Sequence, residues 1–195
     1  AKKNNFKVFV GDEKNVLERF YLCSKKFPAD LIVRVCADNP FIDNKEIEKL
    51  ILYFKRNYKK NDYLQNFLVS KNSLYASGFG AEIFKIECLK KVYLSAKLSN
   101  DKEHVTRYIR NNPFKFKSSY YVGNKNFHFP YLNFDVDTRK DLKKLNKILT
   151  QLNIKLSTKG EIIIRRYLNK SINEDLINLF PINRSLTGLG NLKTL

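Results

Sequence analysis

The sequence lacks methionine and tryptophan and contains only three cysteines and seven glycines. It has no apolar run of about 18 residues, the length that a membrane span needs. It also has no basic start followed by an apolar stretch and a small-residue cleavage site. These absences predict a soluble protein with no membrane partner and no secretory signal. Because methionine is absent, Ala1 is no initiator residue, and we expect the chain to begin inside a longer protein.

The three cysteines exclude two further classes of protein. Cys23, Cys36 and Cys88 are odd in number and widely spaced, which argues against a disulfide framework and against paired metal-binding cysteines. We therefore predict three buried structural thiols. A reducing, cytoplasmic location fits them best.

Acidic residues are scarce beside basic ones, with 19 Asp and Glu against 37 Lys and Arg and a net charge of +18. Such a charge can mark a nucleic-acid-binding protein. Most of the basic residues are Lys, however, and they are dispersed along predicted helices, whereas bidentate phosphate recognition favours Arg. We interpret them as solvated faces and do not expect nucleic acid as a partner. A basic module that binds nucleic acid or another polyanion remains the alternative function.

The hydrophobic pattern predicts an α/β fold in the first third of the chain. The 43% hydrophobic content suffices for one well-buried core. Apolar alternation predicts a strand over 6–10, and the β-branched run over 31–36 predicts a strand buried on both faces of a parallel sheet. Helical spacing predicts helices over 16–24 and 47–54. Strands that alternate with helices are expected to run parallel, joined by right-handed crossovers.

The hydrophobic pattern is less regular in the rest of the chain. We predict irregular strands over 63–84, helices over 86–97 and 100–111, a strand-like stretch over 114–129 and a helix over 138–152. Beyond residue 153 the pattern fits a strand or a short helix, followed by a tail. We therefore expect one domain over 1–152, with a linker and the start of a second module over 153–195.

Two pairs of residues have the spacing of a helix start. Asp43 is the predicted N-cap of the helix over 47–54, with Glu46 three residues further on. Thr138 and Asp141 have the same relation, which makes Asp141 a capping residue rather than a metal ligand.

Asp135 and Asp137 form the other conspicuous group of carboxylates, in "LNFDVDTRKDL". Two residues apart on a strand, they point to the same face and repel each other unless a cation neutralises them. Mg²⁺, which takes one or two carboxylates together with substrate phosphate oxygens, is one such cation. Spacing alone leaves open a metal pair or the polar edge of a strand. Asp38 follows the predicted strand over 31–36, at the end where open sheets bind ligands.

Four ordered blocks then carry a resemblance to a family. They are "VFVGDEKNVLERFYLCSKKFPADLIVRVCADNPFID", "GFGAEIFKIECLKK", "DKEHVTRYIRNNP" and "NFDVDTRKDL". Over roughly residues 6 to 150 the chain resembles cytidylyltransferases of the spore-coat polysaccharide biosynthesis type, relatives of the CMP-Kdo and acylneuraminate synthetases. The resemblance implies a Rossmann-like, three-layer αβα fold of the nucleotide-diphospho-sugar transferase type. It also implies transfer of CMP from CTP to an acidic sugar with Mg²⁺, and a homodimer.

The resemblance assigns roles to individual residues. Asp38, Asp135 and Asp137 match the catalytic, metal-binding carboxylates. The matches in the sugar pocket are Arg34, Glu82, His104, Thr106 and Arg107. For His104 a purely structural helix position is the alternative, and for Arg34 a stacking or ion-pair role.

Two features depart from the family pattern. The family's Gly- and Arg-containing nucleotide loop would precede Ala1, so we expect a fold incomplete at its N-terminus and weak or no catalysis. The tail "LFPINRSLTGLGNLKTL" resembles the opening of an aminopeptidase-like domain. A sugar-nucleotide-dependent glycosyltransferase on the same fold is a further alternative, because fold does not fix function.

Overall fold

The computed structural model describes residues 5–67, 74–155 and 157–170. The chain divides into two compact units. The sheet unit comprises Ala1–Arg34, Lys49–Gln65 and Glu82–Tyr121. The aromatic unit comprises Val35–Glu48, Asn66–Ala81 and Val122–Leu195.

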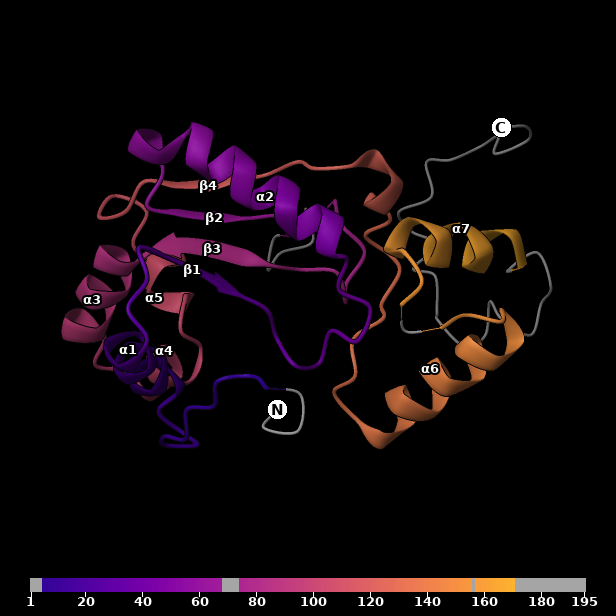
Figure 1. The fold of residues 1–195 in the computed structure, drawn as a ribbon, viewed down its shortest axis with the longest axis horizontal. Helices are drawn as coiled ribbons and strands as arrows, with labels where there is room; N and C mark the ends of the chain where they lie inside the picture. Colours follow the sequence, from indigo (N-terminus) through magenta and orange to yellow (C-terminus); the bar gives the residue numbers. More distant parts are fainter. Residues whose placement is uncertain (1–4, 68–73, 156, 171–195) are drawn as a thin grey trace. The chain divides into compact units, whose positions relative to one another are not determined.

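Helices and strands alternate at first and then give way to helices (Figure 1). In chain order the elements are α1 (Val16–Lys26), β1 (Leu31–Arg34), α2 (Asn44–Arg56), the 3₁₀ helix η2 (Tyr58–Lys60), β2 (Tyr63–Gln65), β3 (Glu82–Lys85), α3 (Ile86–Ser95), α4 (Ser99–Glu103), α5 (Arg107–Arg110), β4 (Ser118–Tyr120), the 3₁₀ helix η3 (Lys125–Phe127), α6 (Arg139–Gln151) and α7 (Gly160–Lys170).

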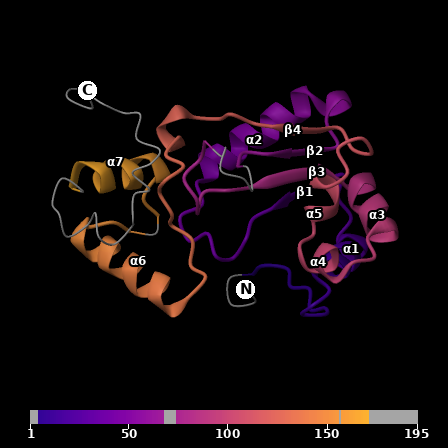
Figure 2. The same cartoon turned by 180° about the vertical axis from the view of Figure 1, so that it is seen from behind.

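The four strands form one mixed sheet in the order β1-β3-β2-β4, which Figures 1 and 2 show from opposite sides. β3 pairs antiparallel with both β1 and β2, and β2 pairs parallel with β4. β1 and β2, which are joined through α2, therefore run in the same direction, as a crossover requires. The prediction of a parallel sheet is wrong because β3 lies antiparallel between them.

The first two predicted strands differ most from the structure. Residues 6–10 form no regular element, and β1 ends at Arg34 rather than at residue 36. All four residues of β1 are only partly buried. Among the described strands only β3 pairs with β1, and the partial burial of β1 differs from the burial on both faces that its β-branched composition predicted.

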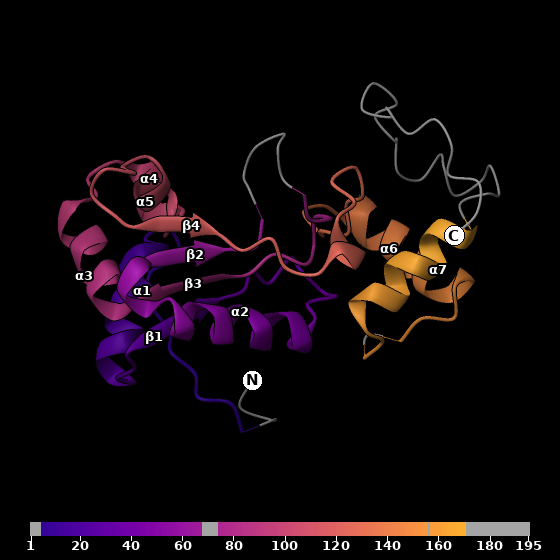
Figure 3. The same cartoon turned by 90° about the horizontal axis from the view of Figure 1, so that it is seen from above.

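Helices cover both faces of the sheet. On one face, Leu17 of α1, Val92 of α3 and Ile109 of α5 pack in one buried cluster with Tyr63 and Phe84 of the sheet. Figure 3 shows α2 on the opposite side of the strands from α4 and α5. The result is the expected three-layer arrangement.

The predicted helix over 100–111 is interrupted. The backbone N–H of His104 donates to Asn100 (3.0 Å) and closes α4, and α5 begins only at Arg107. The side chains of Val105 and Thr106, between the two helices, are each 1% exposed. Both side chains are therefore buried at the break between the two helices.

Edge-to-face rings dominate the core of the aromatic unit. Phe79 lies 5.2 Å from Phe127 and 5.5 Å from Phe134, and Phe134 lies 5.6 Å from Tyr167, measured between ring centroids. Such contacts stabilise a core beyond the effect of the buried area alone. Leu145 and Ile148 of α6, and Ile163 and Ile164 of α7, belong to the same cluster. Helix α7, beyond the boundary predicted at residue 152, thus shares this core; the tail over 171–195 lies outside the described residues.

Both predicted helix starts are confirmed. Thr138 caps α6 in a reciprocal capping box with Asp141. Asp43 Oδ1 accepts from the backbone N–H groups of Lys45 (2.8 Å) and Glu46 (3.3 Å) at the start of α2. Its Oδ2 accepts from the backbone N–H of Gly160 (2.8 Å), where α7 begins. One carboxylate thus stabilises two positively polarised helix termini.

The cysteines are only in part as predicted. Only Cys88 is buried, whereas Cys23 and Cys36 are partly exposed. Burial raises the pKa of the Cys88 thiol to about 12. Within the described parts of the chain, no helix combines the length and the apolar composition that crossing a membrane would require.

The packing of α7 makes a first prediction. Ile163 is fully buried, so Ile163→Ala should lower the free energy of unfolding by about 2–5 kcal/mol through lost contacts and a cavity. Arg165→Ala, at an exposed position of the same helix, should change it by less than about 0.5 kcal/mol. Urea unfolding followed by circular dichroism measures both. Equal values for the two variants would contradict the placement of α7 in the core.

Candidate functional site

The three predicted metal-binding aspartates come from two segments of the aromatic unit. Asp135 and Asp137 lie in an irregular segment before α6, which is not the strand that their spacing predicted, and Asp38 follows β1. The backbone N–H of Val136 donates to the carbonyl of Asp38 (2.9 Å), and that of Phe134 donates to Ser77 (3.0 Å). These bonds fix Asp135 between its neighbours. We call Asp38, Asp135 and Asp137 the acidic cluster.

The surroundings of Asp135 in the acidic cluster disfavour its negative charge. Burial raises the pKa of Asp135, the Ser77 hydroxyl that donates to Asp135 Oδ2 lowers it, and the negative charges of Asp38 and Asp137 raise it further. Asp38 Oδ1 is buried without a hydrogen-bond partner. A buried, unpaired carboxylate oxygen costs free energy unless a proton or a cation satisfies it.

These features fit a hard divalent cation. Mg²⁺ binds oxygen ligands and commonly takes one or two carboxylates, with water and substrate phosphates completing its shell. Asp38 and Asp135 supply such oxygens. Throughout residues 5–67, 74–155 and 157–170, no three His, Cys, Asp or Glu side chains gather into a ready-made metal site. Asp141 is engaged elsewhere, since hydrogen bonds from Thr138 lower its pKa.

Gly78 allows the chain to approach Asp135 closely. Its φ of +95° is unfavourable for other residues, and a Cβ atom there would lie 2.8 Å from the carbonyl carbon of Phe134. Ser77, the hydrogen-bond partner of Asp135, directly precedes it. The sequence marked the Gly78–Gly80 region only as irregular, so Ser77 was missed.

A second polar group lies in the sheet unit, centred on Glu82, whose side chain is 1% exposed. Glu82 Oε2 accepts from Arg34 Nη1 (2.5 Å). Its Oε1 accepts from the hydroxyls of Tyr63 and Thr106 (both 2.6 Å) and from Arg110 Nη1 (3.0 Å). Burial and the charge of Glu82 raise the pKa of Tyr63, which keeps its hydroxyl protonated as a donor. These five residues are the Glu82 cluster.

Comparisons with known proteins identify the family. A family model described as "Cytidylyltransferase" matches residues 2–165. The chain belongs to the cytidylyltransferase family. It is also similar to a solved structure of a cytidylyltransferase from Leptospira borgpetersenii serovar Hardjo-bovis, with a TM-score of 0.77 and 25% identity, covering 91% of this chain and 71% of that one. The predicted fold class and the assignment to a family of nucleotidyltransferases are thereby confirmed.

Two curated proteins are similar in sequence to this cytidylyltransferase. The protein called "Uncharacterized protein MJ1063" from Methanocaldococcus jannaschii is 33% identical over 172 residues, which are 87% of this chain and 68% of that protein. The spore coat polysaccharide biosynthesis protein SpsF from Bacillus subtilis is 26% identical over 147 residues, 75% of this chain. The chain spans 58% of the length of SpsF, less than two thirds.

In the structure of this chain, some of the predicted sugar-pocket residues lie together, but not all of them do. Arg34, Glu82 and Thr106 meet in the Glu82 cluster. Arg107 Nη1 donates instead to Asp101 (2.7 Å), and His104 is exposed after α4. The roles of all five in substrate binding stay predictions.

Two members of the Glu82 cluster were missed from the sequence. Arg110 follows Thr106 by four residues, and this helical spacing could have indicated it. Tyr63 had no such signal, because its contact with Glu82 depends on the pairing of β2 with β3.

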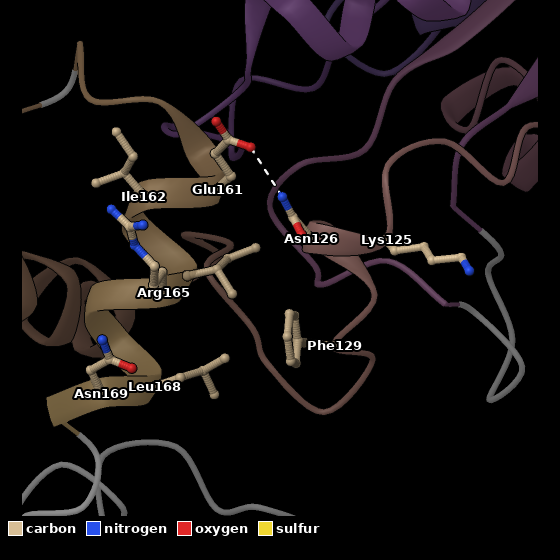
Figure 4. Close-up of a pocket in the computed structure, with 9 residues that line it drawn as sticks. Lys125, Asn126, Phe129, Glu161, Ile162, Arg165, Leu168 and Asn169 are labelled. Carbon is tan, nitrogen blue, oxygen red and sulfur yellow. Dashed lines mark hydrogen bonds between the residues drawn. The ribbon is translucent and has the colours of Figure 1, made fainter. Parts of the chain in front are cut away.

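The aromatic unit also contains an open pocket of about 540 Å³ between η3 and α7 (Figure 4). Phe129 faces Leu168 across it, and Asn126 donates to Glu161 (3.2 Å) at its rim. None of the predicted site residues lines this pocket. The pocket is therefore separate from the acidic cluster and from the Glu82 cluster in its lining residues.

The charges of Asp135 and Asp141 predict opposite effects on stability. Because its folded-state pKa is raised, ionised Asp135 destabilises the fold, and this cost grows as pH rises through that pKa. Asp135→Asn should therefore raise the midpoint of thermal unfolding at pH 7. Asp141, whose pKa is lowered, stabilises the fold when ionised, so Asp141→Asn should lower the midpoint.

Thermal unfolding of both variants at pH 7 and below pH 3.8, the ordinary pKa of Asp, measures these effects. Each difference from the unmodified protein should shrink as the pH falls, because both carboxyls then become protonated. A lower midpoint for Asp135→Asn at pH 7 would contradict the repulsion inferred for the acidic cluster.

Proposed function

We propose that this protein transfers CMP from CTP to a sugar and releases pyrophosphate, as a cytidylyltransferase of the spore-coat polysaccharide type. The observation that carries the proposal is the acidic cluster, in which a buried Asp38 oxygen lacks a partner and the pKa of Asp135 is raised. A site that is destabilised in isolation is expected where a ligand later supplies the missing interaction. Triphosphate with Mg²⁺ is such a ligand.

In the proposed reaction a sugar hydroxyl oxygen forms a bond to the α-phosphorus of CTP. The bond from that phosphorus to the bridging oxygen of the departing pyrophosphate breaks, and the hydroxyl proton is released. Bound Mg²⁺ would neutralise negative charge on the attacked phosphate and on the pyrophosphate. Asp38 and Asp135 would hold the ion, the Ser77 hydroxyl orients the Asp135 carboxylate, and the charge of Asp137 adds to the attraction for a cation.

The sugar in this proposal is an acidic one of the Kdo or acylneuraminate kind, used for surface polysaccharide. The name of SpsF supports the polysaccharide role by similarity. A homodimer and a cytoplasmic location complete the proposal and rest on the resemblance and on the number and spacing of the cysteines in the sequence. Sedimentation velocity tests the dimer.

Pyrophosphate release from CTP tests the reaction. The full-length gene product should release pyrophosphate with Mg²⁺ and one member of a panel of acidic and neutral sugars. Asp135→Asn should lower kcat by about a hundredfold or more, as expected for a lost electrostatic contribution to the transition state. Asp141→Asn, in the same segment but used for capping, is the matched control and should keep its activity. Full activity in Asp135→Asn would exclude Asp135 as a metal ligand.

Binding of Mg²⁺ can be measured without turnover. At a concentration ten times the Kd, Mg²⁺ should stabilise the folded protein by about 1.4 kcal/mol. The rise in the unfolding midpoint should disappear in Asp38→Asn and Asp135→Asn and persist in Asp141→Asn. A rise that survives all three substitutions would place the ion elsewhere.

A further inference from the structure

Three segments of the aromatic unit carry the acidic cluster and its hydrogen-bond partner. The first is the turn over 36–39, closed by a backbone hydrogen bond (3.2 Å), which we call the Asp38 turn. The second is the segment over 77–80, and the third is the segment over 132–136, which contains Asp135. The separation of the two carboxylates therefore depends on the bonds that join these segments.

Backbone hydrogen bonds join the segment of Asp135 to both of the others. The N–H of Val136 donates to the carbonyl of Asp38 (2.9 Å). The N–H of Phe134 donates to the carbonyl of Ser77 (3.0 Å), within an isolated parallel bridge. These two bonds hold Asp135 from both sides, but neither of them joins the Asp38 turn directly to the segment of Ser77.

The side chain of Asn39 makes that third connection. Its Nδ2 donates to the carbonyl of Gly80 (3.1 Å), so the Asp38 turn is bonded to the segment over 77–80. The three segments thus form a closed ring of hydrogen bonds. Pro40 follows Asn39 and restricts its backbone to extended conformations, which lowers the entropy lost when the bond forms.

The bond from Asn39 is not required to hold the chain around Gly80, because a second asparagine does so. Asn66 is 1% exposed, and its Nδ2 donates to the carbonyl of the residue before Gly80 (3.3 Å). Its Oδ1 accepts from the backbone N–H of Ala81 (2.8 Å). Asn39, by contrast, is partly exposed and directly follows Asp38. The bond from Asn39 therefore serves to fix the Asp38 turn.

We propose that Asn39 is a positioning residue that sets the separation of the Asp38 and Asp135 carboxylates and so favours Mg²⁺ over Ca²⁺ at the acidic cluster. Mg²⁺ demands near-ideal octahedral geometry at about 2.0–2.1 Å, whereas Ca²⁺ accepts flexible arrangements at about 2.3–2.6 Å. A loosened Asp38 turn therefore weakens the binding of Mg²⁺ more than that of Ca²⁺. This assignment rests on the proposed function, in which Asp38 and Asp135 hold Mg²⁺.

Cation binding to the full-length protein without substrate tests the preference. Asn39→Leu keeps the approximate size of the side chain but has no donor for Gly80. The Kd for Mg²⁺, taken from the rise of the unfolding midpoint over a series of MgCl₂ concentrations, should increase about tenfold, as when a residue that orients a metal ligand is lost. The Kd for Ca²⁺, measured in the same way, should change by less than about threefold.

Asn112→Leu is the matched control. It removes a similar bond, from Asn112 Nδ2 to the carbonyl of Tyr108 (2.8 Å), in the sheet unit. Both Kd values should stay unchanged in this variant, although the unfolding midpoint falls. Asn39→Ala also lacks the donor and should show the same selective loss of Mg²⁺ binding as Asn39→Leu. A selective loss in only one of these two Asn39 variants would contradict the hydrogen bond as its cause.

Amide hydrogen exchange tests the positioning without any metal. The backbone N–H of Val136 bonds to Asp38, so its exchange rate reports whether the Asp38 turn stays in place. Asn39→Leu should accelerate this exchange about tenfold, the scale of one lost hydrogen bond, whereas Asn112→Leu should leave it unchanged. An unchanged rate at Val136 in Asn39→Leu would overturn the positioning role.

The outcomes separate this inference from the proposed function. Equal increases of the two Kd values in Asn39→Leu, or no change in either, overturn the inference and leave the Mg²⁺ site of the proposed function standing. A full-length protein without substitutions that responds to neither cation overturns both.

Discussion

The buried carboxylate of Glu82 is the interaction on which the sheet unit depends. A buried charge is tolerated only when it is paired and fully hydrogen-bonded. Glu82 meets this requirement with donors from β1, β2, α5 and the N-cap of α5. The order of the sheet meets the same requirement, because β3 lies between β1 and β2, so that Arg34 and Tyr63 reach Glu82 from the two neighbouring strands. The interruption between α4 and α5 likewise brings Thr106 to the carboxylate.

The acidic cluster of the aromatic unit, unlike Glu82, is not fully hydrogen-bonded. The backbone bonds from Phe134 and Val136 draw the Asp135 segment between Ser77 and Asp38. Glycine at position 78, where a Cβ atom would meet Phe134, makes this approach possible. The ring of Phe134, directly before Asp135, packs against Phe79 and Tyr167, and this packing offsets the repulsion among the acids. Stability gained in the core thus permits an unfavourable arrangement at its edge.

Local features of this fold could be predicted from the sequence, and non-local ones could not. The capping box of Thr138 and Asp141 and the N-cap role of Asp43 follow from spacing alone, because each bond joins residues two or three positions apart. The antiparallel position of β3 between β1 and β2 involves residues about 50 positions apart, which no local pattern records. For the same reason Asp38 and Asp135 could be recognised as candidates, whereas Ser77, Tyr63 and Arg110 were missed. The family resemblance supplied long-range information at matched positions but not the contacts between them.

The difference between satisfied and unsatisfied carboxylates separates structural from ligand-binding acids in this chain. Glu82 and Asp43 accept hydrogen bonds at both oxygens, so a ligand would have to displace protein donors to reach them. Asp38 has a buried oxygen without a partner, and it adds to the repulsion that raises the pKa of Asp135. A cation there would replace a repulsion rather than an existing bond, so its binding gains more free energy than it would at Glu82.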